Sequence, residues 1–193
     1  MTRARATVGV VGLAVAAVVL VLGVGAGQSG QRPTSGPFAW LRPAPPPTGW
    51  TVARLAGGAT LAYPPGWKQV KTDPGTASAA LLSGSGRIVG YLNATPKQGA
   101  ETLANWSRFR PAHNRGEDDR NVRLIASAGN LKFRGGRGSC VIDTYTTSKA
   151  SYREIACLVS GRASSAVIVA AAPVELWNHQ AATLRRAVSS FGT

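Results

Sequence analysis

The N-terminal part of the chain contains 22 consecutive residues, 6–27, with no charge and a single hydroxyl group, that of Thr7. A helix rises about 1.5 Å per residue, so a helix of this length reaches roughly 33 Å and matches the ~30 Å hydrocarbon core of a bilayer. Arg3 and Arg5 precede this run, and basic residues favour the cytoplasmic side of a membrane. We therefore predict a single-pass membrane protein with a cytoplasmic N-terminus and with everything after Gln28 exported.

Our first interpretation of residues 1–27 is an uncleaved signal anchor, because the apolar region of a cleaved signal peptide is shorter, about 7 to 15 residues. Val24 and Ala26 occupy the −3 and −1 positions of a processing site, so secretion after cleavage near Ala26 is the alternative. Gly23 and Gly27 have a spacing that brings two helices close, but apolar segments rich in Gly and Ala contain it by chance. A homodimer is therefore left open.

Residues 28–48 contain six prolines and cannot form a helix, because proline fixes φ and lacks a backbone N–H. This density favours polyproline II, so we interpret the segment as a semi-rigid linker. Phe38, Trp40 and Leu41 interrupt it and either lie at the head-group level of a membrane or pack on the folded part. Residues 49–193 then form one extracytoplasmic domain.

The charge of the chain is strongly positive, with 22 Lys and Arg against 8 Asp and Glu. Residues 49–193 alone keep a net charge of +10. Such a domain attracts anionic partners, and for an exported domain these are an anionic lipid, a wall polymer or an envelope protein rather than nucleic acid. The excess of Arg over Lys, with much Ala, Gly and Val, is typical of a GC-rich bacterial genome.

The alternation of apolar and polar residues predicts many short strands, and helical spacing predicts two helices. Leu103, Trp106 and Phe109 place the first helix over residues 98–112, before a polar loop at 114–120, and Pro173 opens a second helix that runs to the chain end. The expected strands cover residues 54–63, 67–70, 78–82, 87–94, 122–128, 139–147, 151–160 and 164–172. Since no βαβ alternation occurs, the predicted class is α+β: an antiparallel β-sheet with helices packed on it, after one transmembrane helix and a Pro-rich linker.

The strongest local signal is the hairpin formed by residues 139–147 and 151–160. If Ser148 and Lys149 make the turn, opposed residues have numbers that add up to 297, and Cys140 faces Cys157. Directly opposed antiparallel residues have Cα atoms about 4.5 to 5.5 Å apart, which a disulfide can bridge. Because an exported domain meets an oxidising environment, we predict a Cys140–Cys157 disulfide on the apolar side of the sheet.

The order of elements resembles the PsbP-like, or Mog-like, small sandwich domains, which include exported LpqN-type actinobacterial proteins. The resemblance covers residues 52–191 and rests on Ala-Tyr-Pro-Pro-Gly-Trp at residues 62–67, a mid-chain helix, a hairpin-rich centre, and a closing helix that ends Ala-Val-Ser-Ser-Phe at residues 187–191. It implies an accessory or binding role, with no shared catalytic residues to carry over.

Candidate bases for a nucleophile are few: His113 lies in the predicted polar loop and His179 on the polar face of the last helix. The sequence contains neither a Gly-x-Ser-x-Gly elbow nor a phosphate-binding Gly-Lys-Ser or Gly-Lys-Thr loop. Asp143 and Glu154 oppose each other in the predicted hairpin, and paired carboxylates can perform acid–base chemistry. We expect basic neighbours to neutralise them instead, namely Lys132, Arg137 and Arg153.

Two further motifs have simple structural interpretations. Residues 117–119 are three adjacent acids without the spaced ligands of a calcium loop, so we expect a solvated loop paired loosely with Arg115 and Arg120. Residues 133–138, Phe-Arg-Gly-Gly-Arg-Gly, are a single copy of a pattern that nucleic-acid binders use in repeats, so we expect a turn.

We therefore expect no catalytic residues, no cofactor and no metal site. Our hypothesis is a non-enzymatic, membrane-tethered extracytoplasmic domain that binds a protein or an anionic envelope component. The alternatives are an exported envelope enzyme and a domain that binds a lipid or another apolar ligand between helix and sheet.

Overall fold

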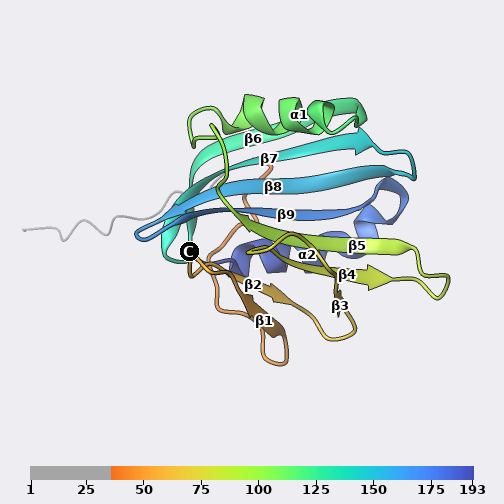
Figure 1. Ribbon diagram of the computed structural model, residues 1–193, viewed down its shortest axis with the longest axis horizontal. Helices are drawn as coiled ribbons and strands as arrows, with labels where there is room; N and C mark the ends of the chain where they lie inside the picture. Colours follow the sequence, from red (N-terminus) through yellow and green to blue (C-terminus); the bar gives the residue numbers. More distant parts are fainter. Residues whose placement is uncertain (1–35) are drawn as a thin grey trace, which may run out of the picture. The chain divides into compact units, whose positions relative to one another are not determined.

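The computed structural model describes residues 36–193, so the predicted membrane segment at residues 6–27 lies outside the described part. Within this part seven strands form one antiparallel sheet in the order β3-β4-β5-β9-β8-β7-β6 (Figure 1). Their bounds are Lys68–Gln69 (β3), Ala77–Leu82 (β4), Ile88–Pro96 (β5), Arg120–Phe133 (β6), Gly136–Thr146 (β7), Ser151–Gly161 (β8) and Ser165–Pro173 (β9). The predicted α+β class, an antiparallel sheet with helices, is confirmed.

Two helices and a small second sheet complete the domain. α1 spans Trp106–Gly116, and α2 spans Trp177–Ser190 after the single 3₁₀ turn η1 at Val174–Leu176. β1 (Thr51–Arg54) and β2 (Thr60–Tyr63) pair with each other as a separate hairpin. Neither helix of residues 36–193 is long and apolar enough to cross a bilayer.

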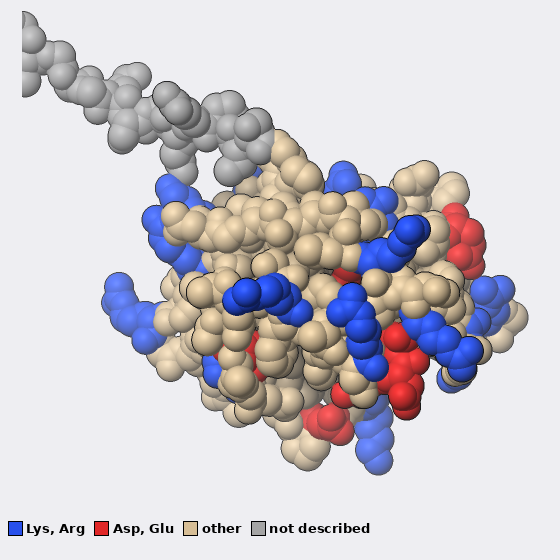
Figure 2. All heavy atoms as spheres, turned by 90° about the horizontal axis from the view of Figure 1, so that it is seen from above, with Lys and Arg blue, Asp and Glu red and all other residues tan. Residues whose placement is uncertain are grey.

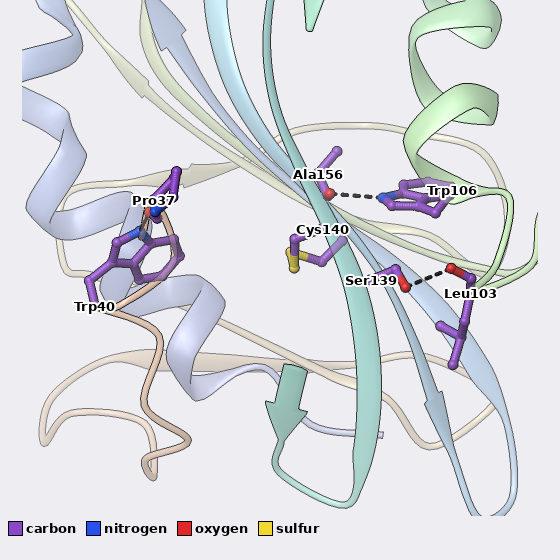
Figure 3. Close-up of a disulfide and its surroundings, with 8 residues drawn as sticks. Pro37, Trp40, Leu103, Trp106, Ser139, Cys140 and Ala156 are labelled. Atoms are coloured by element: carbon purple, nitrogen blue, oxygen red, sulfur yellow. Dashed lines mark hydrogen bonds between the residues drawn. A yellow bond between two sulfur atoms is a disulfide. The ribbon is translucent and has the colours of Figure 1, made fainter. Parts of the chain in front are cut away.

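The helices lie on opposite sides of the large sheet, as Figure 3 shows with the sheet nearly edge-on. α2 packs on β9, and Leu184 and Val188 of α2 are fully buried against the larger apolar core. α1 packs on β6 and β7, where Trp106 buries its ring in a second, smaller core with Val141 and Ala156. The Trp106 Nε1–H donates to the Ala156 carbonyl at 2.9 Å, which fixes α1 on this side.

The β7–β8 hairpin has the predicted register. Thr147 and Ala150 close a two-residue turn at Ser148 and Lys149, and Cys140 pairs with Cys157 across the strands. The two cysteines form the predicted disulfide, with Cα atoms 4.1 Å apart and with both side chains in the core on the α2 side. The bond therefore joins two central strands within the larger core (Figure 3).

Four predicted boundaries are wrong. α1 begins at Trp106 rather than at residue 98, because Thr102 and Asn105 form a turn with reciprocal backbone-to-side-chain hydrogen bonds of 2.7 and 3.1 Å. It continues through Pro111 to Gly116, into the segment predicted as a loop, and β6 is longer than predicted. The predicted strand at 54–63 is broken by a turn in which the Leu55 N–H donates to the Ala59 carbonyl at 2.9 Å.

Part of the Pro-rich segment packs on the domain. Phe38 and Leu41 are buried in the larger core, and the Ala44 N–H donates to the Ser189 carbonyl of α2 at 3.0 Å. Trp40 is half-buried beside them, and its Nε1–H donates to the Pro37 carbonyl at 2.8 Å (Figure 3). Of the two alternatives for these aromatic residues, packing on the folded part is the one observed.

Candidate functional site

The most unusual group of side chains is a buried ionic cluster between α1 and the sheet. Asp143 of β7 and Glu154 of β8 are opposed in register and both have an exposed fraction of 0%. Arg110 of α1 reaches Glu154 with two hydrogen bonds, Nε to Oε1 at 2.7 Å and Nη2 to Oε2 at 2.9 Å. This bidentate geometry is the strong form of an arginine–carboxylate pair. It links α1 to β8 between residues that are 44 positions apart in sequence.

Asp143 has no such donor. Neither of its carboxyl oxygens has a hydrogen-bond partner among residues 36–193. Burial raises the pKa of Asp143 to about 8, and the negative charge of Glu154 adds to this effect. Near neutral pH the carboxyl group of Asp143 is therefore mostly protonated and neutral.

The cations predicted to neutralise these acids are elsewhere. Arg137 donates to the carbonyl oxygen of Asn130 at 3.4 Å, and Lys132 is exposed on the edge strand β6. Arg153 follows the opposite side of β8, where its Cζ lies 4.9 Å from the centroid of the Trp177 ring. The prediction of neighbouring cations is wrong in its residues: Arg153 faces away because alternate residues of a strand face opposite sides of the sheet, whereas Arg137 lies six residues, roughly 20 Å, along β7 from Asp143.

The charge of the cluster also affects its neighbours. Burial alone would lower the pKa of Arg110, but the charge and hydrogen bonds of Glu154 raise it, so the guanidinium stays protonated. Burial, followed by the charge of Glu154, raises the pKa of Tyr145 and that of Asp119. Because both central carboxyl groups are closed to solvent, the cluster holds α1 in place and offers no surface for a substrate.

A solvent-exposed groove lies on the same side of the sheet, next to the β7–β8 turn. It has a volume of about 300 Å³ and is lined by Ile88, Tyr91, Tyr145, Thr147, Ser148, Lys149, Tyr152 and Ala171. Tyr145 and Tyr152 stack with ring centroids 5.8 Å apart. The groove thus combines aromatic walls with one cation, Lys149, at its edge.

A second hollow, of about 240 Å³, runs beside α1. The rings of Trp106, Phe109 and His113 follow one another along the helix with successive centroids 6.1 Å apart. Glu101 lies at the opposite side and accepts the N–H groups of Gln98 and Gly99, both at 2.8 Å. Burial alone would raise the pKa of Glu101, but these donors lower it, so the carboxylate is ionised and already satisfied.

The other sequence-derived candidates lie far from one another in the fold. His113 is exposed in the last turn of α1 and His179 is exposed on α2, on the other side of the sheet, and neither imidazole forms a hydrogen bond within residues 36–193. Residues 117–119 join α1 to β6, and in the described part they form no ion pair with Arg115 or Arg120. No group of three or more His, Cys, Asp or Glu in that part is arranged to hold a metal ion.

The segment at 133–138 contains the predicted turn, formed by Arg134 and Gly135 between β6 and β7. Gly135 has φ +81°, a conformation that favours glycine. Arg134 is part of the fold rather than a free ligand for nucleic acid, because its Nη1 donates to the Ser190 carbonyl at 3.1 Å and its carbonyl accepts the Thr193 N–H at 3.1 Å.

The sequence did not reveal the role of Arg110. The opposed pair Asp143 and Glu154 followed from the hairpin register, but the arginine comes from a helix whose position on the sheet has no sequence signal. The grooves were missed for the same reason, since β5, β7, β8 and β9 come together only in the folded sheet.

Comparison with solved structures gives a fold assignment. The chain is similar to the solution structure of the cyanobacterial PsbP protein CyanoP from Synechocystis sp. PCC 6803, with a TM-score of 0.55 and 16% identity over 75% of this chain and 92% of that chain. It also matches LpqN of Mycobacterium tuberculosis, described as involved in cell envelope biogenesis, with a TM-score of 0.42 and 11% identity over 74% of this chain and 89% of that chain. No protein-family model and no curated protein matches the sequence.

The chain therefore has the PsbP-like fold that its element order resembles. At this level of identity the likeness defines the fold and not the activity.

Proposed function

We propose that the protein is a non-enzymatic domain, tethered to the cell membrane by residues 6–27 and exposed outside the cytoplasm, that binds an anionic component of the envelope. Export is supported by Arg3 and Arg5 before the apolar run and by the disulfide, because disulfides persist in oxidising compartments. A binding role rather than catalysis is supported by the closed carboxyl pair and by the separation of His113 from His179.

The observation that carries the proposal is the excess of unpaired cations. Residues 36–193 contain 19 Lys and Arg but 8 Asp and Glu, and three of these acids, Glu101, Asp143 and Glu154, are buried. Within these residues only Arg87 and Arg110 pair with a carboxylate. Figure 2 shows Lys and Arg side chains standing out across much of the face seen from above. Such a surface attracts anions in a salt-dependent way.

Vesicle capture tests the proposal. The full-length chain, held in nanodiscs of zwitterionic phosphatidylcholine, is expected to retain phosphatidylglycerol vesicles at low salt and to release them by about 0.5 M salt, where the screening length falls to a few Å. Vesicles of phosphatidylcholine alone are the matched control. Equal retention of the two vesicle types, or retention that ignores salt, would contradict an electrostatic partner.

The tether has its own test. A reporter that is active only in the cytoplasm, fused after Thr193, is expected to be silent, and full-length protein is expected in washed membranes. Activity of the reporter would overturn the orientation. A mature protein that starts at Gly27 would replace the anchor by the secreted alternative.

The groove lined by Tyr145 and Tyr152 supports a second function, the binding of an apolar molecule with an acidic end group. Its aromatic walls suit an acyl chain, and Lys149 at its edge suits a carboxylate. Dodecanoate is the probe, and Ile88→Asp is expected to weaken its binding at least tenfold because Ile88 lines the groove. Val52→Asp is the matched control, since Val52 is similarly exposed, at 43% against 38%, but lies on β1. Equal effects of the two variants would exclude the groove.

A further inference from the structure

Two arginines on the α2 side of the sheet lie on tryptophan rings. Arg153 of β8 has its Cζ 4.9 Å from the centroid of Trp177, the first residue of α2. Arg185, two turns further along α2, has its Cζ 5.6 Å from the centroid of Trp40 in the N-terminal segment. A flat guanidinium on an aromatic ring keeps its edge N–H groups available to a further partner.

Neither arginine has a carboxylate partner in the described part of the chain, where the ion pairs are Arg87–Glu175 and Arg110–Glu154. The Nε atom of each is buried and has no hydrogen-bond acceptor within residues 36–193. Buried donors are nearly always satisfied in folded proteins, so two unsatisfied ones on neighbouring cations indicate a missing acceptor.

The two positive charges also act on each other. Burial lowers the pKa of Arg153, and the charge of Arg185 lowers it further. Like charges that are partly withdrawn from water repel unless an opposite charge lies between them. The acceptor that this place lacks is therefore an anion rather than a neutral group.

We propose that Arg153 and Arg185 form a binding site for a phosphate-type oxyanion, held between β8, α2 and the Trp40 segment. Guanidinium groups match the oxygens of phosphate in both charge and geometry, and both tryptophans hold the arginines in place for this contact. The inference rests on the proposed preference for an anionic partner and names its site. A free phosphate ion and the phosphate of a lipid head group share this chemistry.

The direct readout is the pair of Arg Nε–H resonances in NMR spectra of the full-length chain in zwitterionic detergent. Inorganic phosphate is expected to shift the resonances of Arg153 and Arg185, since their Nε groups gain an acceptor, and to leave that of Arg186 unmoved. Arg186 is the internal control because it follows Arg185 on α2 and is exposed. Unmoved Arg153 and Arg185 resonances, or an equal shift of Arg186, would overturn the site.

Substitutions give the second measurement. Arg153→Gln and Arg185→Gln are each expected to weaken phosphate binding at least tenfold, whereas Arg186→Gln, which removes the same charge from the same helix, changes it less than twofold. The Lys variants of Arg153 and Arg185 keep the charge but lose the paired N–H donors of the planar guanidinium, so they are expected to bind phosphate nearly as weakly as the Gln variants. Equal losses in all three positions would show that net charge alone attracts phosphate and would overturn the site.

Two further titrations distinguish the sources of the phosphate group and the two proposals. Both ligands carry the phosphate group and are expected to shift the two resonances; a shift that saturates at lower concentration with phosphatidylglycerol vesicles than with the free ion assigns the site to a lipid head group, and the reverse assigns it to a soluble phosphate. If the Arg153→Gln/Arg185→Gln protein no longer binds phosphate but loses no vesicle retention, the site exists but is separate from the envelope contact. If the native protein retains vesicles while its Nε resonances ignore both ligands, the site fails and the proposed function stands.

Discussion

Arg153 and Glu154 are neighbours in β8, yet their side chains face opposite sides of the sheet and meet opposite conditions. Glu154 is fully buried with Arg110, which binds it through two hydrogen bonds. Arg153 is half-buried on Trp177 and, within residues 36–193, has a second cation rather than an acid beside it. The difference suggests two roles. A buried charge whose hydrogen bonds are all made within the protein stabilises the fold, whereas a charge that is held in place but has no oppositely charged partner can bind a ligand.

The largest expected loss of stability comes from removing the arginine of the buried Arg110–Glu154 pair. Arg110→Met leaves two buried acids without a cation and is expected to cost about 4 kcal/mol of unfolding free energy, measured by urea denaturation. Arg108→Met is the control, because Arg108 lies exposed on the same helix, and it is expected to change stability by less than about 0.5 kcal/mol. Similar values for the two variants would show that the buried pair does not hold α1.

The disulfide comes next, since it joins β7 to β8, the strand that carries both Arg153 and Glu154. Cys140 and Cys157 are 17 residues apart in sequence, and the chain-entropy account of such a loop gives roughly 3 kcal/mol. Cys140→Ser and Cys157→Ser are each expected to lose as much as the double variant, because either removes the same bond. Additive losses, or two free thiols in protein recovered from the envelope, would contradict this prediction.

The register, the disulfide and the apolar face of α2 were predictable because each depends on local periodicity, but Pro173, predicted to open this helix, ends β9 instead. Period-two alternation fixes which residues oppose each other once Ser148 and Lys149 are taken as the turn, and helical spacing places Trp177 and Leu184 on one face. The start of α1 was not predictable in this way, since Leu103 keeps the helical spacing but belongs to the Thr102–Asn105 turn. Contacts such as Arg110 with Glu154 depend on how a helix lies on the sheet, which no single segment encodes.

The protonated carboxyl group of Asp143 predicts how the unfolding free energy depends on pH. Asp143 loses its proton near pH 3.8 when unfolded but keeps it to about pH 8 when folded, so its contribution to stability is present at low pH and lost as the pH rises between these values. Asp143→Asn has no such proton to lose. The variant is expected to match the native protein at pH 4 and to be the more stable of the two at pH 8, because it has no buried carboxyl proton to lose.

Urea denaturation at the two pH values measures this difference. Glu117→Gln serves as the control, because Glu117 is an exposed acid outside the cluster. Parallel curves for the native and Asp143→Asn proteins would show that Asp143 is ionised in the fold at neutral pH.

The smallest effect on stability is expected at Arg153 and Arg185, which have no carboxylate partner within residues 36–193. Arg153→Gln and Arg185→Gln each remove one contact between a cation and an aromatic ring and are expected to cost less than about 1 kcal/mol, measured by the same urea titration in the absence of phosphate. A loss as large as that of Arg110→Met would mean that these arginines serve the fold, and the contrast between the two sides of β8 would disappear.

The stabilisation of the full-length protein by phosphate tests the central claim most directly. At a phosphate concentration one hundred times the dissociation constant, a ligand that binds only the folded state raises the unfolding free energy by about 2.7 kcal/mol. We predict this gain for the native and Arg186→Gln proteins and none for the Arg153→Gln/Arg185→Gln protein. An equal gain in all three proteins, or no gain in the native one, would contradict an oxyanion site between Arg153 and Arg185.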